Sequence, residues 1–198
     1  MDQQHRRYRR IFTFMLCVLR LFYTFEYRGR ENIPEGGALI CSNHSKWLDP
    51  FFLTFAYGFD TQLHIMAKVE LFRIPGLRWF LKRSGTYSVD RSIMDFKAIR
   101  TSLSYLKNGE KIAIFPEGTR ASEDDVIAAK RGAVKLADRS GCPIVPTYIP
   151  RKKGLFRKIT IVIGKPYYVN PEHVKLSPAD YTRLSDEMME KIKLLKVK

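Results

Sequence analysis

Two short blocks of this sequence hold residues whose types and spacing suit acid–base chemistry on an anionic substrate. In the first block, Asn43 to Asp49, a histidine at position 44 stands five residues before an aspartate. A histidine oriented by a carboxylate is a common form of general base. The second block, Phe115 to Arg120, combines an acid, a glycine and an arginine after an apolar run. The first block suits proton transfer from a hydroxyl group and the second suits anion binding, so together they predict an enzyme.

The geometry of the first block depends on the elements beside it. Ala38–Ser42 is a short apolar run that predicts a strand, and Asp49-Pro50 is typical of a helix N-cap followed by proline at the first helical position. His44 then lies in the turn between them, where Asp49 can accept a hydrogen bond from one ring nitrogen and leave the other free. The alternative for Asp49 is helix capping alone. The remaining histidines (His5, His64 and His173) lack an acid at this spacing, and we expect structural roles for them.

The rest of the chain alternates between strand-like and helix-like stretches. Further strands are expected at 63–67, 87–89, 111–115, 144–148 and 159–163. Helices are expected at 94–106 and 128–137, and a last one follows Ser177, which stands as an N-cap before proline and an acid. This alternation predicts an α/β fold with a mostly parallel central sheet flanked by helices.

The N-terminus combines four arginines (Arg6, Arg7, Arg9 and Arg10) with an apolar run over 11–19. The run lacks a cleavage site and is shorter than the ~20 residues of a membrane span. As a helix it has a narrow basic stripe and a broad apolar face, which favours an amphipathic helix at a membrane interface. The alternative is a helix packed on the core of the protein itself. We therefore expect a membrane-associating helix over 1–27 and one catalytic domain over 28–198.

Composition indicates an anionic partner. The 198 residues include 35 Lys and Arg against 20 Asp and Glu, a net charge of +15. The anionic partner could be nucleic acid, an anionic membrane, or an acidic carrier or substrate. The basic loop Arg151–Lys153 contributes to this surplus. The cysteines Cys17, Cys41 and Cys142 have no metal-ligand spacing, and no nucleotide-binding glycine loop is present. We therefore expect neither a metal nor a cofactor.

Several motifs in order resemble the glycerolipid acyltransferases, in particular the bacterial enzymes that acylate 1-acylglycerol 3-phosphate. Asn-His-x4-Asp at 43–49 and Phe-Pro-Glu-Gly-Thr-Arg at 115–120 carry most of the resemblance. Lys-Val-Glu-Leu-Phe from position 68, the segment 85–91, and the segments 130–133 and 144–147 match further motifs of that family. The resemblance covers about residues 28–165.

The resemblance implies a reaction and a role for each matching residue. The family transfers a fatty acyl group from a thioester, either acyl-CoA or acyl carrier protein, to the sn-2 hydroxyl of lysophosphatidic acid. His44 would be the general base, Asp49 would orient it, and no acyl-enzyme on Ser42 or Ser45 is expected. The substrate-binding positions would be Lys68, Arg91, Glu117, Gly118, Thr119 and Arg120. The cations among them would bind the phosphate, although an ion pair with Asp90 or Asp95 is the alternative for Arg91.

The expected partners are lysophosphatidic acid, the acyl thioester and an anionic membrane surface, with the protein peripheral on the cytoplasmic face of the cell membrane. Glycerol 3-phosphate or another lysophospholipid is the alternative acceptor. A non-enzymatic basic module that binds a membrane or nucleic acid is the remaining alternative, and no nucleic-acid motif supports it. Candidates for lining an acyl-chain pocket are Phe51, Phe52, Trp79 and Phe80.

Overall fold

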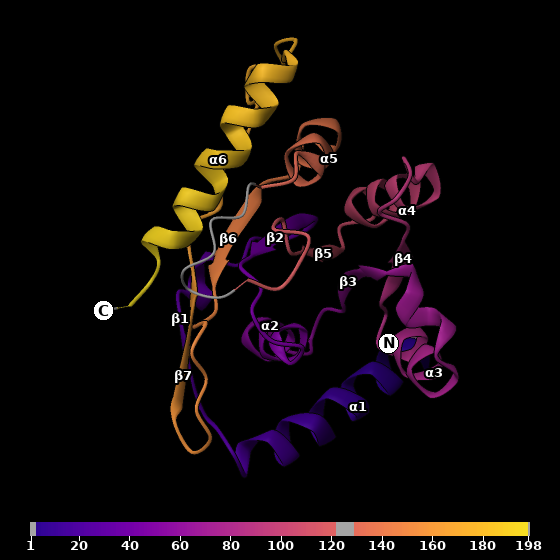
Figure 1. The fold of residues 1–198 in the computed structure, drawn as a ribbon, viewed down its shortest axis with the longest axis vertical. Helices are drawn as coiled ribbons and strands as arrows, with labels where there is room; N and C mark the ends of the chain where they lie inside the picture. Colours follow the sequence, from indigo (N-terminus) through magenta and orange to yellow (C-terminus); the bar gives the residue numbers. More distant parts are fainter. Residues whose placement is uncertain (1–2, 122–128, 198) are drawn as a thin grey trace.

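A single sheet with helices on both faces forms the body of the molecule (Figure 1). The computed structural model describes residues 3–121 and 129–197. The strands in these residues are β1 (Thr24–Arg28), β2 (Ala38–Ser42), β3 (Leu63–Lys68), β4 (Tyr87–Val89), β5 (Lys111–Ile114), β6 (Ile144–Tyr148) and β7 (Lys158–Ile163). The helices are α1 (Gln3–Arg20), α2 (Asp49–Tyr57), α3 (Pro75–Arg83), α4 (Phe96–Lys107), α5 (Gly132–Ser140) and α6 (Pro178–Leu194). Two short 3-10 turns lie at Arg30–Asn32 and Val69–Arg73.

The sheet is mostly parallel, which confirms the expected fold class. Its strand order is β1-β7-β6-β2-β5-β3-β4. Strands β2 to β6 all run in the same direction, and β7 pairs antiparallel with β6 while β1 pairs parallel with β7. The carboxyl ends of β2, β3, β4, β5 and β6 therefore meet at one edge of the sheet. In parallel sheets this edge is where ligands usually bind.

Alternation of side chains along the strands divides the core into two layers. Ala38 and Ile40 of β2 face the layer of α1 and α2, whereas Leu39 and Cys41 face the layer of α4, α5 and α6. Figure 1 shows these two groups of helices on opposite sides of the sheet. Because both faces of the central strands are buried, these strands are continuous apolar runs, and the sequence located them well. The strands expected at 38–42, 87–89 and 144–148 are confirmed with the same bounds.

The N-terminal segment differs from the expected helix over 1–27. Helix α1 ends at Arg20, and residues Thr24–Arg28 form β1 beside β7. Phe25 and Tyr27 alternate with polar residues and pack against the core, which is a strand pattern that the helical interpretation overlooked. One face of α1 is buried in the core through Tyr8, Phe12 and Leu19. The alternative of a helix packed on its own domain therefore holds for this face.

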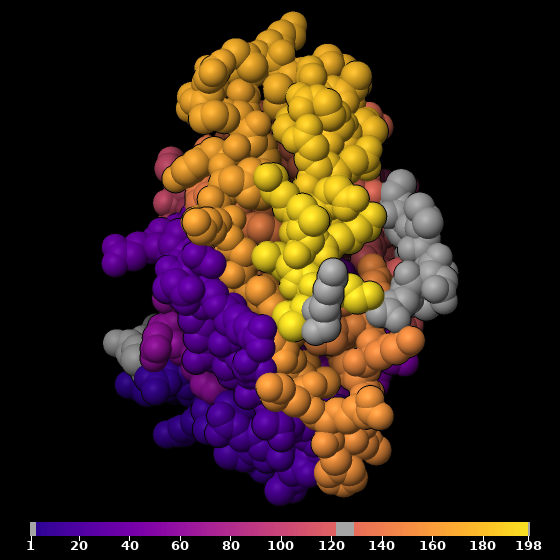
Figure 2. All heavy atoms as spheres, turned by 90° about the vertical axis from the view of Figure 1, so that its left-hand side faces the viewer, coloured from indigo at the N-terminus to yellow at the C-terminus, as the bar shows by residue number. Residues whose placement is uncertain are grey.

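Helix α6 begins where the sequence predicts, whereas the bounds of α4 and α5 differ from the expected 94–106 and 128–137. Ser177 caps α6 in a capping box with Asp180, as the sequence predicts. In a view from the β1 edge, α6 lies along the outside of the molecule and the N-terminal region lies below it (Figure 2). Helix α5 begins at Gly132 rather than near 128, and Ala128 lies outside the described residues. No helix within the described ranges has the length and apolar character needed to cross a membrane.

Candidate active site

His44 and Asp49 meet across the turn between β2 and α2, as their spacing predicts. His44 Nδ1 lies 3.0 Å from Asp49 Oδ2. The same oxygen accepts backbone N–H groups from Ser45 at 2.6 Å and Lys46 at 2.8 Å. Asp49 is the first residue of α2, and Leu48 and not Asp49 is the N-cap. The Asp49 carboxylate turns back to the amides of the preceding turn. The side chain thus fixes the shape of the turn that holds the histidine.

The Asp49 carboxylate is fully buried and remains ionised. Burial alone would raise its pKa, but the hydrogen bond with His44, the charge of Lys153 and the backbone N–H of Lys46 hold that pKa below its usual value. Its second oxygen, Oδ1, lies 2.7 Å from the ammonium nitrogen of Lys153. A carboxylate that stays ionised accepts from Nδ1–H and so selects the histidine tautomer.

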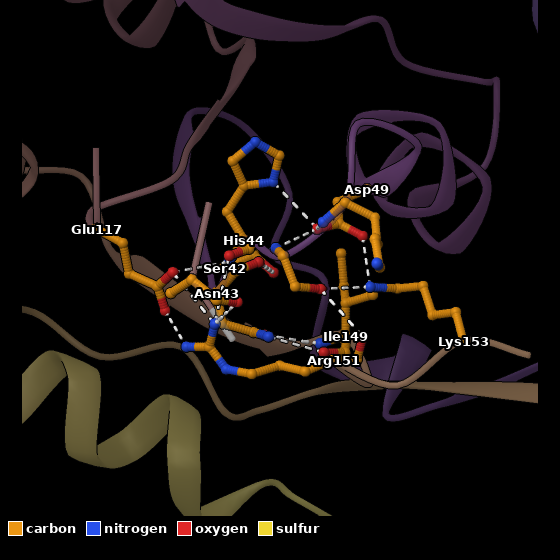
Figure 3. A network of polar contacts seen from close by, with 11 residues as sticks. Ser42, Asn43, His44, Asp49, Glu117, Ile149, Arg151 and Lys153 are labelled. Carbon is orange, nitrogen blue, oxygen red and sulfur yellow. Dashed lines mark hydrogen bonds and ion pairs between the residues drawn. The ribbon is translucent and has the colours of Figure 1, made fainter. Parts of the chain in front are cut away.

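The ring of His44 is held on one side and open on the other. It stacks on Phe115 with 4.2 Å between ring centroids, and the side chain is 19% exposed. In the part of the chain that the structure describes, Nε2 has no hydrogen-bond partner, and Figure 3 shows this nitrogen pointing away from the polar network. With the proton on Nδ1, the Nε2 lone pair is available to accept a proton from a hydroxyl group.

Asn43 anchors the turn to the neighbouring strand. Its side-chain amide donates to the carbonyl of Ile149 at 2.7 Å, and its carbonyl accepts from the N–H of Ile149 at 2.9 Å. The residue is 2% exposed. This two-way contact replaces the sheet hydrogen bonds where β2 and β6 diverge, and it sets the position from which His44 projects.

Glu117 joins the loop after β5 to the loops after β2 and β6. Its buried carboxylate forms an ion pair with Arg151 and accepts the backbone N–H of His44 at 3.3 Å. Arg151 also donates to the carbonyls of Ala121 at 2.7 Å and His44 at 3.3 Å. Figure 3 shows Glu117 and Arg151 below the histidine. The Glu117 side chain is only 1% exposed, so the structure places it in the scaffold of the site and not at its surface.

The remaining expected substrate-binding residues lie along the same edge of the sheet. Lys68 ends β3, Arg91 follows β4, and Thr119 and Arg120 are exposed in the loop after β5. Lys68 pairs with Glu70 at 2.9 Å, and both side chains are about half exposed. The parallel order β2-β5-β3-β4 brings these cations to the side of the site beyond Glu117.

Arg91 contacts the glycine loop and not the acids near it in sequence. Its guanidinium donates to the carbonyl oxygen of Gly118. Asp90 accepts from Ser92, and Asp95 caps α4 through the N–H of Ala98. Among the described residues, neither acid forms an ion pair with Arg91. The alternative raised for Arg91 is therefore wrong.

Gly118 is required by its backbone and by its surroundings. Its φ is +69°, and a Cβ built there would lie 2.5 Å from Cε of Lys130. Any other residue would be strained at this φ and would displace the Lys130 side chain. The glycine thus lets the loop pass beneath Lys130 with its carbonyl turned to Arg91.

A cavity of about 330 Å³ opens beside the glycine loop, between the β4–α4 segment and α5. Its apolar lining includes Met66, Ile99, Ile114 and Leu136, and Arg91 is at its polar side. Phe115 also lines it and separates it from the His44 ring. The candidates Phe51, Phe52, Trp79 and Phe80 are not among its lining residues. Phe52 in particular is fully buried in the core next to α1.

Sequence reasoning missed the inward direction of two basic side chains. Arg151 and Lys153 were expected to belong to a basic loop that suits an anionic partner, yet they pair with Glu117 and Asp49. The available signal was the alternation of side-chain direction in an extended segment, continued beyond the end of β6. It places residues 151 and 153 on one side of the segment and the exposed Lys152 on the other. Among the described residues, no group of three or more His, Cys, Asp or Glu side chains has the arrangement of a metal site.

Comparisons with known proteins agree with this arrangement. The family model described as Acyltransferase matches residues 24–150. A 1-acyl-sn-glycerol-3-phosphate acyltransferase from Bacillus subtilis is 38% identical over 146 residues, which cover 70% of this chain and 71% of that protein. The enzyme of the same name from Borreliella burgdorferi is 32% identical over 181 residues, covering 85% and 72% respectively.

A solved structure extends the likeness to the fold. The crystal structure of the 1-acyl-sn-glycerophosphate (LPA) acyltransferase from Thermotoga maritima aligns with a TM-score of 0.67. The alignment covers 99% of this chain and 79% of that one, at 24% sequence identity.

Proposed function

Because this chain belongs to the acyltransferase family, we propose that it acylates the sn-2 hydroxyl of 1-acylglycerol 3-phosphate and so forms phosphatidic acid. The chain is an acyltransferase enzyme, and the names of its relatives supply the acceptor. The alternative of a non-enzymatic basic module therefore falls away. The acyl donor in this proposal is a thioester of coenzyme A or of acyl carrier protein, and no other cofactor takes part.

The observation that carries the proposal is the open Nε2 of His44 behind a fixed Nδ1–Asp49 contact. An alcohol is a poor nucleophile near neutral pH, and a positioned base accelerates its attack by roughly 10²–10⁴-fold. His44 takes the hydroxyl proton while the oxygen attacks the thioester carbonyl carbon. The C–S bond then breaks, and the imidazolium returns the proton to the departing thiolate. The products are the ester and a free thiol, and no bond to the enzyme forms.

The acceptor phosphate is assigned to the cationic edge, which is formed by Lys68, Arg91 and Arg120 at the carboxyl ends of the parallel strands. These three residues lie at or after the ends of three adjacent parallel strands, and arginine suits phosphate through its planar set of donors. Gly118 and Thr119 shape the loop beside them. Glu117 supports this loop through Arg151 rather than by touching the substrate.

The cavity beside Phe115 suits an apolar chain. Its volume of about 330 Å³ and its methionine, isoleucine and leucine lining match a site for a hydrocarbon segment. Only the Phe115 ring separates the cavity from the His44 ring, which supports a role in holding one acyl chain close to the reacting carbonyl.

The experiment that tests this function offers the purified full chain two acceptors and two donors. Lysophosphatidic acid and glycerol 3-phosphate are each combined with acyl-CoA and acyl carrier protein thioesters, and the lipid products are identified by mass. We expect phosphatidic acid from lysophosphatidic acid with at least one donor. Lysophosphatidic acid formed from glycerol 3-phosphate as the main product would overturn the choice of acceptor.

Peripheral association with the cytoplasmic face of the membrane is part of the proposal. Phe14 in α1 and Leu21, just after that helix, are 67% and 70% exposed, and Trp47, Ile74 and Trp79 are exposed as well. The basic residues of α1 add attraction to anionic lipid. Deleting residues 1–25 would be a poor test, because it removes buried Tyr8 and Phe12 from the core.

Point substitutions on α1 test the membrane contact more directly. We expect Phe14→Ser with Leu21→Ser to weaken binding to anionic vesicles at least roughly tenfold, since each apolar side chain contributes about 1.5–3 kcal/mol when buried. Leu194→Ser, at the 81% exposed end of α6, is the control. Equal vesicle binding by the double variant and the control variant would remove α1 from the membrane contact.

A further inference from the structure

Lys153 lies behind the His44–Asp49 pair and is buried there. Its Nζ is 2.7 Å from Asp49 Oδ1 and 2.7 Å from Ser45 Oγ, and its side chain is 3% exposed. Figure 3 shows the Asp49 carboxylate between the histidine ring and this ammonium group. The lysine comes from the loop after β6, whereas the histidine and aspartate flank the β2–α2 turn. Two loop segments are thus tied together at one carboxylate.

A lysine in this position is costly, and packing does not require it. Burial removes the hydration of the ammonium group and lowers its pKa, while the charge of Asp49 acts in the opposite sense. Replacing a whole buried ion pair with apolar side chains of similar volume is often neutral or stabilising, so packing alone does not call for a buried charge here. Asp49 is already held by two backbone N–H groups and by His44 without any help from the lysine. The charge of Lys153 therefore calls for a role beyond packing.

We propose that Lys153 is a positioning residue that acts through Asp49 on the base strength of His44; this inference rests on the proposed role of His44 as general base. By holding Oδ1, Lys153 keeps Oδ2 directed at His44 Nδ1. Its positive charge also offsets part of the field of the carboxylate. The imidazole can then accept a proton at Nε2, while Asp49 still stabilises the imidazolium formed during the reaction.

Other charged groups also face the histidine turn and set the background for this effect. From the segments packed against it they are Lys46, Asp49, Glu117, Arg151 and Lys153. Glu117 and Arg151 neutralise each other beneath the turn and contact only the backbone of His44. Asp49 touches the imidazole itself, so a change at Lys153 reaches the ring through that one carboxylate.

A different use of Lys153 would be to activate Ser45 as a nucleophile. Lysine acts as a base towards serine only in its neutral form. The ion pair with buried Asp49 keeps the ammonium protonated, so it donates to Ser45 Oγ and does not take the serine proton. We therefore expect Ser45→Ala to retain most of the turnover.

Lys153→Met in the full chain tests the proposal. We expect kcat at neutral pH to fall roughly tenfold to a hundredfold, by analogy with the hydrogen-bond partners that orient metal-ligating histidines. The acid limb of the pH profile of kcat/KM should move up by about one pH unit, because the carboxylate loses its counter-charge and favours imidazolium. Lys153→Arg should keep the wild-type limb, and a small alkylammonium ion should partly restore Lys153→Ala.

Lys152→Met is the matched control, because it removes the same charge from the exposed neighbouring residue. An unshifted acid limb in Lys153→Met with wild-type kcat would overturn the proposal. If a thermal melt shows that Lys153→Met does not fold, Lys153→Arg is the deciding variant. A shifted acid limb in Lys153→Arg, despite its retained charge, would also overturn the proposal. An acyl group trapped on Ser45 and detected by mass would do the same.

His44→Ala separates this inference from the proposed function. Near-normal turnover in His44→Ala would sink the general-base mechanism itself. An inactive His44→Ala together with a wild-type profile in Lys153→Met would remove only the role of the lysine.

Discussion

The loops around His44 and the cationic edge beside them, to which the proposed function assigns one substrate, are built differently. Around the histidine, the side chains of Asp49, Glu117 and Lys153 are 0%, 1% and 3% exposed, and each is tied to another loop. At the edge, Lys68 and Glu70 are 52% and 46% exposed and pair with each other. Proton transfer requires donor and acceptor within hydrogen-bond reach. Attraction of a phosphate by charge acts over a longer distance and tolerates mobile side chains.

The largest expected effect is a loss of turnover on substitution of His44, which a substitution at the cationic edge should not produce. His44→Ala should lower kcat by at least roughly 10²-fold, as expected for loss of a general base, while the far-ultraviolet spectrum stays that of the folded chain. His173→Asn is the control, since this histidine is exposed at a φ of +53° that asparagine tolerates. A variant at His44 with wild-type turnover would break the comparison.

The buried network should also carry more stability than an exposed one. Glu117→Ala leaves the Arg151 charge without its partner, which should lower the free energy of unfolding by about 3–5 kcal/mol. The control is Glu26→Ala on β1, which removes a partly exposed carboxylate paired with Arg28 and Lys158 and should have a far smaller effect. Chemical denaturation measures both. Equal losses would show that burial does not distinguish the two kinds of ion pair here.

Changes at the cationic edge should appear in KM and much less in kcat. Arg120→Ala should raise KM for lysophosphatidic acid roughly tenfold to a hundredfold, the equivalent of one charge-assisted hydrogen bond. Arg120→Lys should have a smaller effect because it keeps the charge but loses the planar set of donors. Arg100→Ala, on the exposed side of α4, controls for net charge. A fall in kcat equal to that of His44→Ala would place Arg120 in the chemical step.

The smallest expected effect is a pH dependence of stability in the histidine loops. The folded-state pKa of Asp49 lies below its usual value of 3.8, so its ionised form stabilises the fold above that pH. This contribution should be lost as pH falls through the lower folded value. Asp49→Asn should therefore be less stable than the wild type at pH 7, and the difference should narrow at about pH 3. A difference independent of pH would assign it to packing alone.

Much of the fold was predictable because it depends on local pattern. The central strands are continuous apolar runs, and the bounds of β2, β4 and β6 agree with expectation. Ser177 and Asp180 carry the capping chemistry of α6 within a few residues. Strand β1 was missed because its alternating pattern directly follows an apolar helix, and only pairing with β7 distinguishes the two.

The candidate site divides in the same way. The contact between His44 and Asp49 follows from a spacing within one turn, and the family motifs placed the cations at strand ends. The burial of Glu117 did not follow, since an acid after a strand is more often exposed. Its partner Arg151 arrives from another strand, and that approach depends on the order of strands in the sheet.

By itself, the sequence determined the parallel α/β architecture, the family, and the histidine–aspartate pair at the end of β2. These features rest on periodicity and on residues close together in the chain. Only the tertiary structure decided that β6 lies beside β2, which turns Lys153 towards Asp49 and Arg151 towards Glu117. A basic residue in a loop carries no local sign of burial. Whether its charge meets water or a carboxylate depends on which strand ends the sheet brings together.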